Sequence, residues 1–218
     1  YRFFFKNIKV ILLAEPLYDD IKKYVHRKNV FICANGIPNK NKDVQIGQEV
    51  LTPTILFLSN MMEEKGVYEL LEACKILKEK GHVFKCIFVG AWKGISEKDF
   101  RQKCIDYELN EFVCALGPKY GEEKIDFLRN SDVFVFPTYY HNECFPLVLL
   151  EAMSYGKACI STNIAGIPSI IDNKKSGILV NPNDSIELAN SIEFLLKESE
   201  LRKKMGEEGR KKVEREFT

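Results

Sequence analysis

Short apolar runs alternate with segments of helical periodicity along most of this chain. Six of the runs predict buried strands: Thr54–Ser59, Phe84–Val89, Phe112–Leu116, Asp132–Pro137, Lys157–Thr162 and Gly177–Val180. The segments between and after them predict helices: Gly66–Lys80, Glu97–Leu109, Glu122–Arg129, Leu147–Tyr155, Ser185–Lys197 and one from about Glu200 onward. Because the strands are apolar throughout and helical crossovers join them, the sequence predicts an α/β fold, a doubly wound parallel sheet with a helical C-terminus.

The N-terminal part follows a shorter version of the same pattern. Its predicted elements are a strand over Ile8–Leu13, a helix from Pro16 to about Tyr24 and a strand over Asn29–Ala34. The polar, turn-rich stretch Asn35–Asp43 is typical of an interdomain linker. We therefore expect residues 1–44 to be the remnant of one domain with its linker, and residues 45–218 to form a second domain. Because the sequence begins with Tyr1 rather than Met, we also expect upstream sequence to be missing.

Two carboxylates near the fourth predicted strand of the large domain are the main candidate for chemistry. Parallel sheets bind ligands at the carboxyl ends of their strands, and Glu143 lies in the loop after that strand, with Glu151 inside the following helix. Pro146 suits a first helical turn, so the free N–H groups of residues 145–148 and the helix dipole predict a phosphate site. Glu151 would accept hydrogen bonds from ribose hydroxyls. Both glutamates could instead be ordinary surface charges, but the apolar run Leu147–Glu151 makes an unpaired carboxylate there costly.

Composition and charge narrow the function. With 32 Lys and Arg against 31 Asp and Glu, the net charge of +1 disfavours a nucleic-acid binder. Seven cysteines without a CxxC pair indicate free thiols in a reducing cytoplasm, and no apolar stretch is long enough to cross a bilayer. His26, His82 and His141 lack metal-ligand spacing, so we expect no metal. The basic runs Arg202–Lys204 and Arg210–Lys212 are interleaved with glutamates, which favours a salt-bridged helix face over contact with anionic lipid.

Several motifs in order along the chain resemble the group 1 family of retaining glycosyltransferases, which have the GT-B fold with two Rossmann-like domains. Glu143 and Glu151, separated by seven residues, look like the family's E-x7-E motif. The other matching segments extend over nearly the whole chain: Asn35–Pro38, Leu58–Asn60, Glu64–Val67, Leu116–Pro118, Ser131–Pro137, Glu151–Met153 with Gly156, and Gly166–Pro168. The resemblance implies that residues 45–218 are the C-terminal, donor-binding domain, and that residues 1–44 remain from the acceptor-side domain.

The resemblance also implies a role for each candidate site residue. Glu151 would hold the ribose, and Glu143 would lie beside the donor sugar or its phosphate. Lys65 would neutralise the diphosphate, whose other contacts would come from the backbone of Cys144, Phe145, Leu147 and the neighbours of Pro146. Leu116 and Gly117 would line the nucleobase slot, with Lys119 as a candidate contact to the edge of the base. Where many relatives have a G-R-L pattern, this chain has Ser59-Asn60-Met61, so Lys65 would act with another group or with a hydrogen bond from Asn60.

The implied reaction moves a sugar from a nucleoside diphosphate, of the UDP or GDP type, to an acceptor hydroxyl with retention. The resemblance implies no cofactor and no metal, a glycan or lipid-linked acceptor bound through the missing domain, and a setting in bacterial surface polysaccharide synthesis. We expect a cytoplasmic protein, with peripheral association at the inner face of the membrane as an option, and a fragment that is inactive alone. Two alternatives stay open: a nucleotide-sugar epimerase of the same architecture, which would need no acceptor, and a non-catalytic nucleotide-binding or scaffold module.

Overall fold

The large domain is built on a six-stranded parallel sheet. A computed structural model of the 218-residue chain describes residues 8–38 and 52–218. The strands run in the order β5-β4-β3-β6-β7-β8, and every neighbouring pair is parallel. Their bounds are β3 (Thr54–Leu58), β4 (Lys85–Val89), β5 (Val113–Ala115), β6 (Val133–Phe136), β7 (Ala158–Thr162) and β8 (Gly177–Val180). The predicted parallel sheet is confirmed, and each strand lies within its predicted run.

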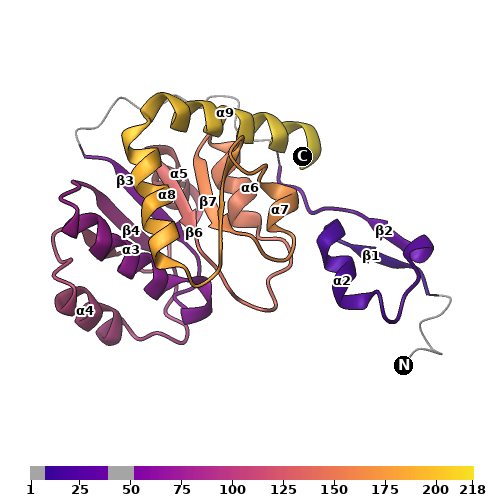
Figure 1. Cartoon of the computed structure of the whole chain (residues 1–218), viewed down its shortest axis with the longest axis horizontal. Coiled ribbons are helices and arrows are strands. Elements are labelled where there is room, and N and C mark those ends of the chain that lie inside the picture. Colours follow the sequence, from indigo (N-terminus) through magenta and orange to yellow (C-terminus); the bar gives the residue numbers. More distant parts are fainter. Residues whose placement is uncertain (1–7, 39–51) are drawn as a thin grey trace.

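Helices cover both faces of this sheet. They are α3 (Val67–Glu79), α4 (Glu97–Asp106), α5 (Gly121–Asn130), α6 (Leu147–Ser154), α7 (Ile167–Ile170), α8 (Ser185–Lys197) and α9 (Ser199–Glu216). In Figure 1, α3 and α8 pack together in front of the sheet while α5 and α6 lie behind it. Every residue of β6 and β7 is buried, as strands covered on both faces must be. The short helix α7 was not predicted, because four residues are too few to show a helical period.

Aromatic rings fill the middle of the core. The ring of Phe57 in β3 lies 5.2 Å from that of Phe88 in β4 and 6.4 Å from that of Phe136 in β6. Phe100 of α4 meets Phe88 edge-on at 5.1 Å, and such tilted and edge-on arrangements are the favoured ones. The three central strands are therefore held in a fixed relation, which fixes the loops that leave their carboxyl ends.

The N-terminal elements form a separate two-stranded parallel sheet. It consists of β1 (Val10–Leu12) and β2 (Val30–Ile32). The helix predicted from Pro16 to about Tyr24 is shorter and split, into a 3-10 turn over Glu15–Leu17 and one α-helical turn, α2 (Tyr18–Ile21). Ala14 is buried against Gly166 beside α7, and Ile37 N–H donates to the carbonyl of Phe217 at 2.7 Å. The predicted boundary between residues 44 and 45 lies outside the described residues and stays a prediction.

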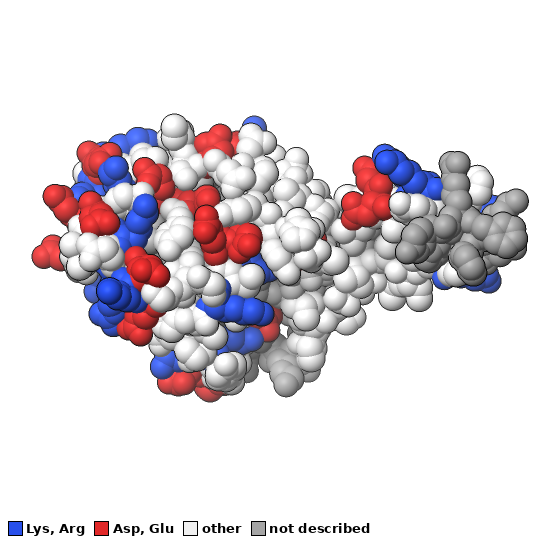
Figure 2. Space-filling view, turned by 90° about the horizontal axis from the view of Figure 1, so that it is seen from below, with Lys and Arg blue, Asp and Glu red and all other residues white. Residues whose placement is uncertain are grey.

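Charges of both signs are mixed over the large domain (Figure 2). The basic runs of α9 are largely paired: Lys203 with Glu200, Lys211 with Glu208, Arg210 with Glu214, and Lys212 with Asp172 at 2.6 Å. This pairing supports the salt-bridged interpretation of the helix face, and lipid contact stays untested. No helix in residues 8–38 or 52–218 is long and apolar enough to cross a membrane.

Glu193 in α8 gives the domain a pH-dependent link to α3. Its carboxylate accepts hydrogen bonds from Lys197 and Lys80 at 2.6 Å and pairs with His82 at 3.1 Å. These partners, Lys197 first, lower the pKa of Glu193 to about 2 from an ordinary value of 4.5. A depressed folded pKa contributes stability that is complete above the unfolded pKa and disappears as the pH falls toward the folded one.

We therefore expect Glu193→Gln to destabilise the protein more at pH 5 than at pH 2. Urea unfolding of the wild type and the variant at pH 5, 4, 3 and 2 measures that difference. The other carboxylates titrate equally in both proteins, so their contribution cancels. A difference in unfolding free energy that stays constant over this range would contradict the assigned pKa.

Candidate functional site

The order of the strands reverses between β3 and β6. The strands β4 and β5 follow β3 on one side, while β7 and β8 follow β6 on the other. Loops that leave β3 and β6 at their carboxyl ends therefore diverge to opposite faces of the sheet, which opens a ligand-binding crevice in folds of this type. The loop after β3 carries Lys65, and the loop after β6 carries Glu143.

Lys65 and Glu143 meet at this crevice. The ammonium of Lys65 donates to Oε2 of Glu143 at 2.7 Å, and the two side chains are only 13% and 11% exposed. Lys65 also lies over the ring of Tyr140, 4.5 Å from its centroid, and 5.6 Å from that of Phe136. The pair is thus largely withdrawn from water, where a charge interaction is stronger than at an exposed surface.

Hydrogen bonds between the two loops hold this pair in position. The carbonyl of Glu64 accepts from the hydroxyl of Thr138 at 3.1 Å and from the N–H of Tyr139 at 2.8 Å. The fully buried Thr138 is anchored in turn, because its carbonyl accepts from the hydroxyl of Thr162 at the end of β7. The backbone of the loop that carries Lys65 is therefore tied directly to the loop that carries Glu143.

Gly66 permits this close approach. It ends the 3-10 turn Glu63–Lys65 with a φ of +81°, a left-handed conformation that favours glycine. A Cβ at this position would lie 2.2 Å from the carbonyl oxygen of Pro137. The glycine therefore allows the β3 loop to pack directly on the end of β6.

Acidic groups surround the Lys65 loop and affect Tyr139. Burial, together with the charges of Glu69, Glu63 and Glu64, raises the pKa of Tyr139 to about 12. Burial also raises the pKa of Glu69, and its Oε2 has no hydrogen-bond partner in the part of the chain that the structure describes. Tyr139 therefore stays protonated at neutral pH and is no candidate for a general base.

The first backbone N–H groups of α6 are available to a ligand. Pro146 is the N-cap and provides no side-chain hydrogen bond, and within the described ranges the N–H groups of Leu147 and Val148 have no acceptor. The carbonyl of Cys144 is occupied by the N–H of Gly166 at 2.9 Å, which braces the loop from the side of α7. The side chain of Phe145 in this loop is buried. Such a helix start attracts anions.

Glu151 lies further along α6 and pairs with Lys124 of α5 instead of Lys65. The distance from Lys124 Nζ to Glu151 Oε1 is 2.7 Å, with side-chain exposures of 26% and 30%. Both residues line a cavity of about 250 Å³ between the two helices. The other residues of its wall are Ile37, Pro38, Gly121, Ile125, Leu128, Ser154 and Tyr155. Sequence reasoning missed Lys124, since no motif or spacing connects it with Glu151.

The remaining predicted contacts lie in two other loops. Gly117, with a φ of +69°, accepts from the N–H of Gly90 at 3.0 Å, and Leu116 beside it is 42% exposed. Lys119 pairs with Glu123 at 3.3 Å. Asn60 is exposed in the loop after β3, while its neighbour Met61 is buried. These positions are compatible with the predicted contacts to the base, which stay a prediction.

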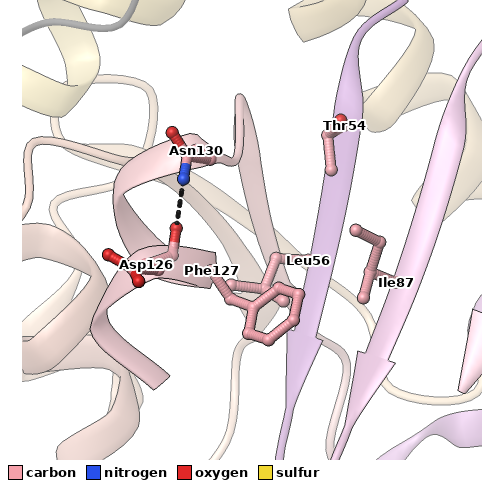
Figure 3. A pocket seen from close by; sticks show the side chains of 6 residues that line it. All are labelled: Thr54, Leu56, Ile87, Asp126, Phe127 and Asn130. Carbon is pink, nitrogen blue, oxygen red and sulfur yellow. Dashed lines mark hydrogen bonds between the residues drawn. The ribbon is translucent and has the colours of Figure 1, made fainter. Parts of the chain in front are cut away.

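The other candidates from the sequence form no constellation. His141 is exposed, and its ring meets that of Tyr140 edge-on at 5.5 Å. Across residues 8–38 and 52–218, no group of histidine, cysteine and acidic side chains could hold a metal ion. A second cavity of about 200 Å³ lies between α5 and the strands β3 and β4 (Figure 3), lined by Thr54, Leu56, Ile87, Asp126, Phe127 and Asn130. None of the predicted site residues lines it.

Sequence and structure comparisons both find glycosyltransferases. Residues 39–212 match the family model described as "Glycosyl transferases group 1". CapM of Staphylococcus aureus, a capsular polysaccharide biosynthesis glycosyltransferase, is 32% identical over 165 residues, which are 74% of this chain but only 41% of that protein. A glycosyltransferase from Rickettsia africae has a TM-score of 0.84 at 23% identity, over 97% of this chain and 59% of that one. Anabaena HepE, solved in complex with UDP, has a TM-score of 0.80 at 18% identity, over 96% of this chain and 59% of that one.

Proposed function

This chain belongs to the group 1 glycosyltransferases, and from that membership we propose that its large domain binds a nucleoside-diphosphate sugar. The protein then transfers the sugar to an acceptor hydroxyl with retention at the anomeric carbon. The observation that carries the proposal is the meeting of Lys65 and Glu143, 2.7 Å apart, at the crevice between β3 and β6. This is where a doubly wound sheet binds its ligand.

The chemistry of these groups suits a departing diphosphate. Charge develops on the leaving phosphate as the glycosidic bond to the donor breaks, so a cation and free amides at that place stabilise the transition state more than the ground state. Lys65 is the cation, and the open N–H groups at the start of α6 are the amides. Glu143 turns from Lys65 toward the hydroxyls of the donor sugar once the diphosphate engages the ammonium. No residue in this scheme needs a metal or a cofactor.

Glu151 and the loop after β5 complete the donor site. The carboxylate of Glu151 opens into the cavity between α5 and α6, where it accepts hydrogen bonds from the ribose hydroxyls. Leu116 and Gly117 flank the base, which is uracil or guanine. HepE was solved with UDP bound, which favours UDP as the first nucleotide to test.

The names of the relatives support a proposal for the acceptor and the cellular setting. CapM is named for capsular polysaccharide biosynthesis, so we infer a glycan or lipid-linked acceptor in the synthesis of a bacterial surface polysaccharide, on the cytoplasmic side of the membrane. This chain spans 41% of CapM and 59% of the Rickettsia protein. We propose that acceptor binding uses the part that these relatives have in addition, and that residues 1–218 alone bind donor without turnover.

A thermal-shift panel of UDP, GDP, ADP and their sugars tests the proposal. A ligand at a hundred times its Kd adds about 2.7 kcal/mol of stability, which raises the Tm of a domain of this size by roughly 5–10 °C. We expect one nucleotide series to produce this shift and Glu151→Ala to lose most of it. Glu111→Ala, which removes an exposed carboxylate in a loop, should respond like the wild type. If none of the nucleotides stabilises the wild type, the proposed donor site is wrong.

A further inference from the structure

The ion pair between Lys124 and Glu151 is a feature of the site that the family motifs do not include. Lys124 lies on α5, and its ammonium approaches Oε1 of Glu151 on α6 to 2.7 Å. Both side chains line the cavity of about 250 Å³. They are about a quarter to a third exposed, at 26% and 30%, so bound ligand and solvent can reach them.

The side chain of Glu151 on α6 reaches this cavity, while its neighbours in the helix are buried. Its neighbours Leu149, Leu150, Ala152 and Met153 are completely buried. Within the described part of the chain, Oε2 of Glu151 has no hydrogen-bond partner, whereas Oε1 is held by Lys124. One oxygen is therefore fixed by the protein, and the other is open to a ligand.

The surroundings of the pair explain why a cation is needed there. Ile37, Pro38, Ile125 and Leu128 contribute apolar groups to the wall, and a carboxylate near apolar groups is costly unless it is paired. The ammonium holds one oxygen of the carboxylate and so limits its rotation. Hydroxyl groups bind a carboxylate that is already oriented more strongly than a mobile one.

We propose that Lys124 is a positioning residue that makes Glu151 selective for a ribose with both of its hydroxyls. This inference rests on the proposed donor site, since it deepens the role of Glu151 there. Lys124 holds Oε1, so that Oε2 faces the vicinal hydroxyls and accepts from them. A 2′-deoxyribose leaves this acceptor with only one of its two hydroxyl donors, and a site built around a hydroxyl rejects the analogue that lacks it.

The test compares UDP with 2′-deoxy-UDP, and GDP with 2′-deoxy-GDP, by calorimetric titration of the full chain. We expect the wild type to bind the ribonucleotide about tenfold more tightly, which corresponds to one hydrogen bond to a charged group. Lys124→Met should weaken ribonucleotide binding about five- to tenfold and leave deoxynucleotide binding within about twofold, so that the ratio approaches one. Lys124→Arg, which keeps the cation, should preserve most of the ratio.

Arg101→Met is the control, because it removes an exposed cation of α4 whose guanidinium pairs with Glu97 on the same helix. It should leave the ratio unchanged. A ratio that stays at the wild-type value in Lys124→Met would overturn the positioning role, and so would tighter ribonucleotide binding, which would mean that Lys124 blocks the site. If the wild type binds neither nucleotide, the proposed function fails and the inference fails with it. Binding without a change in ratio refutes the role of Lys124 alone.

Discussion

Replacing Lys65 with methionine is expected to weaken UDP binding about 10- to 100-fold while uridine binding changes little. The reason is that, in the proposed donor site, Lys65 donates a charge-assisted hydrogen bond to the diphosphate, an interaction of about 1.5–3 kcal/mol. Methionine keeps most of the side-chain volume, so the rings of Tyr140 and Phe136 keep a packing partner. Titration calorimetry with UDP and with uridine separates the phosphate contribution from that of the base and ribose.

The same substitution should also lower the stability of the unliganded protein by about 2 kcal/mol. Glu143 is only 11% exposed, and a largely buried charge that loses its partner is destabilising. The double variant Lys65→Met with Glu143→Gln should regain most of this loss, since it removes both charges, yet UDP binding should remain weak. Lys98→Met, at an exposed position of α4, is the control for the loss of a positive charge. Normal UDP affinity in Lys65→Met would refute the assigned role.

Substituting alanine for Gly66 is expected to destabilise the protein by about 3 kcal/mol or more and to remove nucleotide binding. Two costs add: the left-handed conformation, about 1 kcal/mol or slightly more for a residue with a Cβ, and the contact with the carbonyl of Pro137 at 2.2 Å. The neighbouring atom is backbone at the end of β6, so it cannot rotate away. Relief requires the Lys65 loop to move, which separates Lys65 from Glu143.

Gly81→Ala isolates the steric part of this effect. Gly81 has nearly the same φ, +80° against +81°, but a Cβ there would meet nothing within 4 Å. We expect it to cost about 1 kcal/mol and to leave UDP binding intact. Urea unfolding and UDP titration of both variants make the comparison. Equal destabilisation by the two substitutions would show that the approach of Gly66 to Pro137 is not important.

The strands were predictable because a parallel sheet with two covered faces needs continuous apolar runs. Phe134 and Cys159, on neighbouring strands, are completely buried, and their segments show no polar alternation. The helix expected after Pro16 was wrong in extent: only one α-helical turn forms, and the chain after it turns with Tyr24 N–H and Val25 N–H both donating to the carbonyl of Ile21. The start of α7 packs beside Ala14, a contact between distant parts of the chain that the local pattern does not show.

The site was predictable to the extent that local signals define it. The proline at the start of α6 and the loop positions of Lys65 and Glu143 follow from the order of the elements along the chain. The partners that hold these residues could not be predicted in this way. Thr138 donates to the carbonyl of Glu64, 74 residues away in the sequence, and Lys124 pairs with Glu151, 27 residues away. Such contacts depend on how the loops and helices pack, which the apolar pattern does not encode.

The bond from Ile37 N–H to the carbonyl of Phe217 has a consequence for engineering. It brings Ile37 next to the end of α9, so a unit that runs from Ile37 to Phe217 has adjacent ends. Units with adjacent ends tolerate circular permutation and insertion into a host protein. The domain could therefore be grafted into the surface loop of a fluorescent reporter as a sensor module, with little stretching of either partner.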